Sequence, residues 1–97
     1  MGKLYIVKYC ANEYDDLGYD KPHPIYYSLN EENAREFFEK ERNKEINHFN
    51  DFIKKHPHFK GHEDYQINEN EVDSFEYSLG NWFYRYEFEE CELEKKI

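Results

Sequence analysis

The feature that most restricts the fold of this chain is a two-residue turn, Gly80-Asn81, between two aromatic-rich segments. A glycine-containing pair flanked by alternating apolar residues indicates a β-hairpin. Counting outward from the turn gives three cross-strand pairs: Leu79–Trp82, Tyr77–Tyr84 and Phe75–Tyr86. All six side chains then share one face, which we predict to be the core face of strands 74–79 and 82–93.

One long helix is predicted between Asn30 and Lys55. Asn30, or alternatively Ser28 with Glu31, provides the N-cap, and Pro57 ends the helix. Apolar residues recur between these limits at helical spacing: Ala34, Phe37, Phe38, Ile46, Phe49, Phe52 and Ile53.

The middle of this apolar stripe is interrupted by Glu41 and Arg42. A helix of the predicted length spans about 39 Å. A seven-residue strand such as Leu4–Cys10 spans only about 23 Å. We therefore expect either a break near Asn43 or a half-helix that overhangs the sheet.

The remaining segments complete an α+β fold. We predict the first strand at Leu4–Cys10, an acidic loop at Ala11–His23 and the second strand at Ile25–Ser28. The structure of Tyr65–Asp73 is ambiguous from the sequence. The prediction is one domain over residues 1–97: a single antiparallel sheet (β-β-α-β-β) with one long helix, broken or unbroken, packed on its aromatic face.

The charge balance restricts the function. The chain has 22 Asp and Glu against 13 Lys and Arg, a net charge of −9. This excess disfavours direct binding to nucleic acid or to an anionic membrane, because both depend on Lys and Arg clusters. An aromatic content of 20% argues against a disordered acidic tail. We therefore expect a folded protein with a basic protein partner.

Acidic residues concentrate in two places that we predict to bind this partner. Glu76, Glu87 and Glu89 line the outer face of the hairpin, where alternate residues are about 7 Å apart, and Glu90 continues the row. The first loop adds Asp15, Asp16 and Asp20. The row could imitate a nucleic-acid backbone. It is also typical of a solvated face that keeps a small protein soluble, which is the commoner reason for such a row.

Other chemistry has weaker support. His56, His58 and His62, with His48 on the helix, could supply metal ligands, but their spacing matches no structural zinc motif and no metal site or cofactor is predicted. Neither cysteine lies in a recognisable catalytic setting, so we expect no enzymatic activity.

The start of the chain is too polar for a signal peptide, and no segment is apolar enough to cross a membrane. We therefore expect a cytoplasmic protein. Cys10 and Cys91 are expected to be reduced thiols, adjacent to each other only if the first and last strands pair.

Three strings carry a resemblance to known proteins: residues 4–9 (LYIVKY), 27–37 (YSLNEENAREF) and 86–93 (YEFEECEL). They resemble small β-β-α-β-β proteins encoded by phages and mobile elements of low-GC bacteria. In size and acidity the chain also resembles phage inhibitors of host defence, including anti-CRISPR proteins. The resemblance implies a non-enzymatic inhibitor that covers the basic cleft of a nuclease or CRISPR effector, in the host cytoplasm if a phage encodes it. No functional residue carries over. Alternatives are an accessory protein with a protein–protein interface, or a histidine-cluster metal-binding protein.

Overall fold

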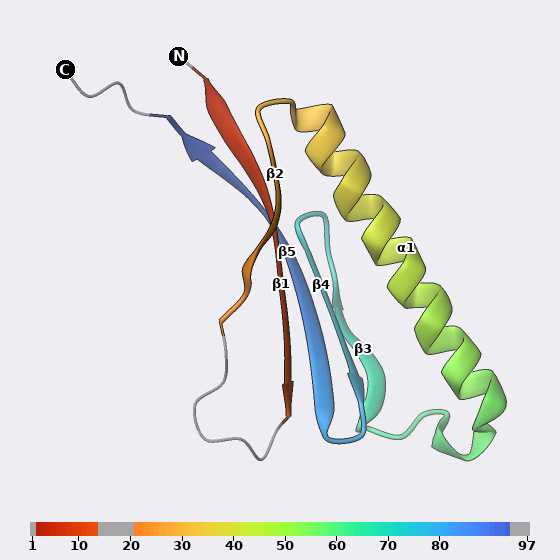
Figure 1. Ribbon diagram of the computed structural model, residues 1–97. Coiled ribbons are helices and arrows are strands. Elements are labelled where there is room, and N and C mark those ends of the chain that lie inside the picture. Colours follow the sequence, from red (N-terminus) through yellow and green to blue (C-terminus); the bar gives the residue numbers. More distant parts are fainter. Residues whose placement is uncertain (1, 14–20, 94–97) are drawn as a thin grey trace.

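The computed structural model describes residues 2–13 and 21–93, which form a five-stranded antiparallel sheet and one long helix (Figure 1). The strand order is β2-β1-β5-β4-β3. The elements are β1 (Lys3–Glu13), β2 (His23–Ser28), α1 (Glu31–Lys55), the 3-10 helix η1 (Pro57–Phe59), β3 (Tyr65–Asn70), β4 (Ser74–Leu79) and β5 (Trp82–Glu92). The predicted α+β class is confirmed, and the segment that was ambiguous in sequence supplies a fifth strand, β3.

The β4–β5 hairpin has the predicted register, with the pairs Leu79–Trp82, Tyr77–Tyr84 and Phe75–Tyr86. Gly80 has a positive φ of 65°, which glycine adopts at little cost. A Cβ atom at this position would also lie 3.1 Å from the hydroxyl oxygen of Tyr65. The turn therefore requires glycine for its backbone conformation and leaves little space for a side chain.

Strands β1 and β5 form the centre of the sheet, each with 11 residues, and pair along their whole length. Eleven residues of antiparallel strand span about 37 Å. The 25 residues of α1 also span about 37 Å. The length mismatch that suggested a break near Asn43 is therefore absent, and α1 is one continuous helix. Asn30 caps it as predicted, since its side-chain oxygen accepts a hydrogen bond from the backbone N–H of Asn33 at 3.0 Å.

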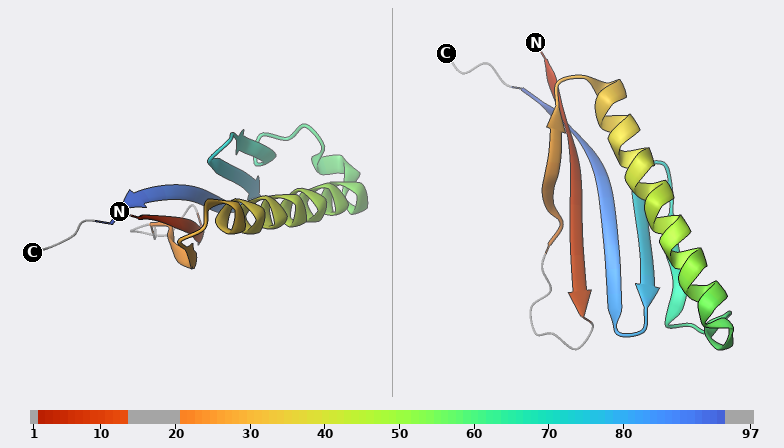
Figure 2. Two further views of the ribbon diagram at one scale, coloured as in Figure 1. Left: turned by 90° about the horizontal axis from the view of Figure 1, so that it is seen from above. Right: turned by 45° about the vertical axis from the view of Figure 1, so that its right-hand side comes forward.

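Helix α1 packs along the aromatic face of the sheet (Figure 2). The buried cluster between them consists of Val7, Phe38, Phe49, Phe75, Tyr77 and Tyr86. Phe38 is fully buried, and its ring meets that of Phe88 edge-on with centroids 6.0 Å apart. Each such aromatic side chain contributes about 1.5–3 kcal/mol of hydrophobic stabilisation when buried.

Arg42 stays within the apolar stripe of α1 because its charged end finds partners in the connection between β3 and β4. Its guanidinium donates to the side-chain oxygen of Asn70 at 2.8 Å and to the carbonyl oxygens of Glu71 and Val72 at 2.6 and 2.9 Å. The side chain lies over the ring of Phe38, and the residue is only 9% exposed. A residue that interrupts the hydrophobic pattern thus attaches the helix to the β3–β4 connection.

Arg35, two turns earlier on the helix, makes a second attachment to the same connection. It donates to the carbonyl oxygen of Val72 at 2.7 Å and to the carboxylate of Asp73 at 2.8 Å. Its guanidinium also lies 3.8 Å from the centre of the Phe88 ring, a cation–π contact. Two arginines therefore attach α1 to the connection between β3 and β4.

Strand β3 has a shift of register between Ile67 and Glu69. Asn68 is the extra residue of this bulge, and its side-chain amide donates to the hydroxyl oxygen of Ser78 at 2.6 Å. The shift brings Glu69 opposite Glu76. One more carboxylate thereby joins the sheet face that faces away from α1.

We expect Arg42→Ala to lower the free energy of unfolding by about 2–4 kcal/mol, because it removes a largely buried side chain that packs on Phe38 and joins α1 to the β3–β4 connection. Urea unfolding followed by circular dichroism measures the change. Lys40→Ala, on the exposed side of α1, is the matched control and should stay within about 0.5 kcal/mol of the parent chain. Equal losses in the two variants would contradict this role for Arg42.

Candidate functional site

The sheet face opposite α1 carries three of the acidic residues that the sequence singled out, Glu76, Glu87 and Glu89. We call it the open face and define it by its charged side chains: Lys8, Glu69, Glu76, Arg85, Glu87 and Glu89. Within residues 2–13 and 21–93, α1 packs on the other face and no second helix covers this one (Figure 2). The open face thus presents four carboxylates and two basic groups.

Arg85 is the centre of this surface. Its Nε donates to Glu87 at 2.6 Å, and its Nη1 lies 2.8 Å from Glu69 and 3.4 Å from Glu76. Burial alone would lower the pKa of Arg85, but hydrogen bonds to Glu87 and Glu69 outweigh burial, and the pKa is raised. One guanidinium therefore holds three carboxylates in place and offsets only one of their charges.

The other predicted carboxylates occupy different positions. Glu89 is on the open face, where it forms an ion pair with Lys8. Glu90 is on the opposite face, because successive side chains of a strand alternate, and there it lies 3.3 Å from Lys3. The predicted acidic row is thus confirmed for Glu76, Glu87 and Glu89, whereas Glu90 is not part of it.

Asp15, Asp16 and Asp20, the predicted contribution of the first loop, lie outside the described residues. The two cysteines are free and are not neighbours, although their strands do pair. Cys10 lies opposite Arg85 and Cys91 opposite Leu4. This register separates the thiols by six positions, about 20 Å along the strands, which is too far for a disulfide.

The histidines do not assemble into a ligand set. His56 and His58 lie against aromatic rings, those of Phe52 and Phe59, and His62 Nδ1 accepts a hydrogen bond from the backbone N–H of Asp64 at 3.1 Å. Among the described residues, no three His, Cys, Asp or Glu side chains are arranged to hold a metal ion. No helix in this part of the chain is long and apolar enough to cross a membrane.

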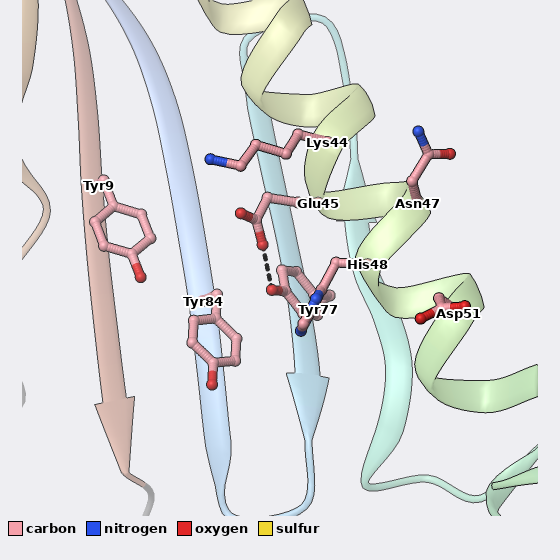
Figure 3. A pocket seen from close by; sticks show the side chains of 8 residues that line it. All are labelled: Tyr9, Lys44, Glu45, Asn47, His48, Asp51, Tyr77 and Tyr84. Atoms are coloured by element: carbon pink, nitrogen blue, oxygen red, sulfur yellow. Dashed lines mark hydrogen bonds between the residues drawn. The ribbon is translucent and has the colours of Figure 1, made fainter. Parts of the chain in front are cut away.

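A groove that the sequence did not reveal lies on the helix side of the sheet (Figure 3). Its volume is about 680 Å³. The sheet contributes Tyr9, Tyr77 and Tyr84, and α1 contributes Lys44, Glu45, Asn47, His48 and Asp51. In sequence these tyrosines read as core residues. The polar pair Glu45 and His48, three residues apart at the border of the apolar stripe, is the only pattern that could have indicated a groove there.

Glu45 is the best-fixed polar group of this groove. Its carboxylate accepts hydrogen bonds from the hydroxyls of two buried tyrosines, Tyr77 and Tyr86, the latter at 3.2 Å. Burial first, and then the Glu45 charge, raise the pKa of both tyrosines far above the ordinary value. Both hydroxyls therefore remain protonated and act as donors that hold the carboxylate in one position.

No protein-family model, curated protein or solved structure matches this chain. Two polar surfaces of the described residues are therefore the candidates for function. One is the open face around Arg85. The other is the tyrosine-lined groove around Glu45.

We expect Arg85→Met to destabilise the chain by about 2–3 kcal/mol at pH 7, since three carboxylates lose their shared partner. Ser74 and then Arg85 hold the pKa of Glu69 below its ordinary value, against the effect of burial. A lowered pKa contributes stability above the unfolded-state value, and this stability is lost as the pH falls through the folded-state value.

The destabilisation by Arg85→Met should therefore shrink in acid, as the pH falls through the lowered folded-state pKa of Glu69. Urea midpoints at pH 7 and pH 3.5 provide the measurement. Lys3→Met, which breaks the exposed Lys3–Glu90 pair, is the control and should show no comparable change. A loss that is the same at both pH values would rule out the proposed charge balance.

Proposed function

We propose that this chain is a non-enzymatic inhibitor that binds the basic nucleic-acid-binding cleft of a host defence protein, such as a nuclease or a CRISPR effector. The observation that carries the proposal is the charge of the open face. Four carboxylates there share two basic groups, and three of the four share the single guanidinium of Arg85.

The two basic groups of the open face neutralise only part of the charge of its four carboxylates, and the remaining negative charge would attract cations. Like charges held close together repel, and a further Lys or Arg side chain from a partner would reduce that repulsion. The carboxylates are already fixed by Arg85 and Lys8, so binding would order few additional side chains. The net charge of −9 would add long-range attraction that speeds association with a basic cleft.

The test begins with affinity purification of the tagged chain from a lysate of a low-GC bacterium at low and at high salt. We expect a basic nucleic-acid-binding protein that is retained only at low salt. Titration of the chain into a complex of that protein with its nucleic acid should release the nucleic acid.

The triple variant Glu76→Gln/Glu87→Gln/Glu89→Gln should bind this protein about 10–100-fold more weakly, with a smaller dependence on salt, because charge pairs across the interface are lost. Glutamine keeps the size and the accepting oxygen of each side chain. The matched control is Glu32→Gln/Glu36→Gln/Glu63→Gln, which removes the same charge from exposed positions elsewhere. Calorimetry that finds both triple variants equally affected would mean that net charge, and not the open face, drives binding.

A second candidate function is favoured by exposed apolar residues at the β2 edge of the sheet. Ile25, Tyr27 and Leu29 are 41%, 58% and 71% exposed. They lie along or just after β2, whose outer edge pairs with no described strand. An edge of this kind can add a strand from another protein. It would suit an accessory protein of a phage or mobile element that acts through a protein–protein interface.

Salt distinguishes the two candidates, because binding at the β2 edge would persist at high ionic strength. In that case Tyr27→Lys/Leu29→Lys should abolish the salt-resistant retention, as two charges would enter an apolar interface. Val72→Lys, at an equally exposed apolar position on the β3–β4 connection, serves as control and should have no effect. Retention that survives Tyr27→Lys/Leu29→Lys would eliminate this interface.

A further inference from the structure

The groove beside α1 combines a fixed carboxylate with aromatic walls. In Figure 3, Lys44, Glu45 and His48 point from the helix toward the sheet, where Tyr84 lies on β5 and Tyr9 lies farther from the helix on β1. Both tyrosines are only partly buried, so part of each ring borders the groove. The groove therefore offers a negative charge and aromatic surface to the same ligand.

The tyrosine rings of the groove support one another. The rings of Tyr77 and Tyr84 are stacked, with centroids 4.8 Å apart and an interplanar angle of 21°. Those of Tyr9 and Tyr86 have centroids 4.7 Å apart. Since Tyr77 and Tyr86 are buried and hydrogen-bonded to Glu45, they hold the outer two rings in position. The groove is thus largely preformed.

Within the described residues, the acceptors of the groove can take further hydrogen bonds. Glu45 forms no ion pair with another described residue. Each of its carboxylate oxygens receives one hydrogen bond from a tyrosine and can accept another. The hydroxyls of Tyr9 and Tyr84 form no hydrogen bond within residues 2–13 and 21–93. Burial and the Glu45 charge raise the pKa of Tyr84, so its hydroxyl stays neutral.

We propose that this groove binds an arginine side chain of a protein partner. A guanidinium is planar, stacks on tyrosine rings and carries five N–H donors, whereas an ammonium is compact and strongly hydrated. The rings of Tyr9 and Tyr84 would bind its faces, and Glu45 would accept its N–H groups in charge-assisted hydrogen bonds.

The basic residue at the rim does not reverse this preference. Lys44 is exposed, so its charge is screened by water and salt and its flexible stem can turn away. Glu45 is partly buried among tyrosine rings, where a charge pair is stronger than at the surface. Asp51 adds a second carboxylate at the rim, 3.0 Å from Lys55.

The groove and the open face lie on opposite sides of the sheet, so the arginine site goes beyond the inhibitor function proposed above. Each can be disabled separately. Substitutions at Glu76, Glu87 and Glu89 should leave the groove unchanged, and substitutions at Glu45 should leave the open face unchanged.

The test is a titration of the ¹⁵N-labelled chain with the capped tripeptide acetyl-Gly-Arg-Gly-amide, followed by amide chemical shifts. The same tripeptide with citrulline has the shape of the arginine peptide without its charge. We expect shifts centred on Tyr9, Glu45 and Tyr84, and citrulline binding at least tenfold weaker. A charge-assisted hydrogen bond contributes about 1.5–3 kcal/mol, which is roughly a 10–100-fold change in affinity.

Substitutions in the groove test whether the arginine peptide binds there. Glu45→Gln should weaken arginine binding at least tenfold, while Glu36→Gln, the same charge change at an exposed position of α1, should not alter it. Tyr84→Leu keeps an apolar side chain without the aromatic ring and should also weaken binding, so the test does not depend on one variant folding. Equal affinity for the arginine and citrulline peptides would overturn the proposal. Shifts confined to the open face, or full binding by a folded Glu45→Gln variant, would do so as well.

Discussion

A single helix packs on a five-stranded sheet and is too narrow to cover one whole face of it. Most features of this molecule follow from that difference in width. Five strands with a spacing of about 4.8 Å make a sheet roughly 19 Å wide between its outer strands, whereas a helix with its side chains is about 10–12 Å across. Helix α1 buries the rings of Phe75, Tyr77 and Tyr86 but leaves Tyr9 and Tyr84 at its side. The groove is therefore the part of the aromatic face that one helix cannot reach.

The presence of only one long helix among the described residues also determines the chemistry of the opposite face. With no described helix above it, that face must be compatible with water, and it is built from charged side chains around Arg85. A hydrophobic face would have favoured aggregation of the sheet. Carboxylates in excess of basic groups keep the surface hydrated while leaving it attractive to cations. Under the proposed function, the residues that hydrate this face are also the ones that would bind the partner, so composition alone could not separate the two roles.

Elements defined by local chemistry were predictable from the sequence, and those defined by long-range contacts were not. The Gly80 turn and the Asn30 cap fixed the hairpin register and the start of the helix, because both act over two to four residues. β3 was ambiguous, since an asparagine-rich edge strand with a bulge has little β propensity. The acidic row was predictable from alternation, but its pairing with Arg85 and the groove around Glu45 required knowing how distant segments meet.

The pairing of β1 with β5 sets the order in which this chain can acquire its structure. β1 is the first described strand and β5 the last, yet they are neighbours along all 11 residues at the centre of the sheet. Before β5 has left the ribosome, β1 can pair only with β2, and the aromatic face beneath α1 is incomplete. Contacts between residues so distant in sequence slow folding. The centre of the sheet can therefore form only once β5 is available, by pairing two strands that lie far apart in the sequence.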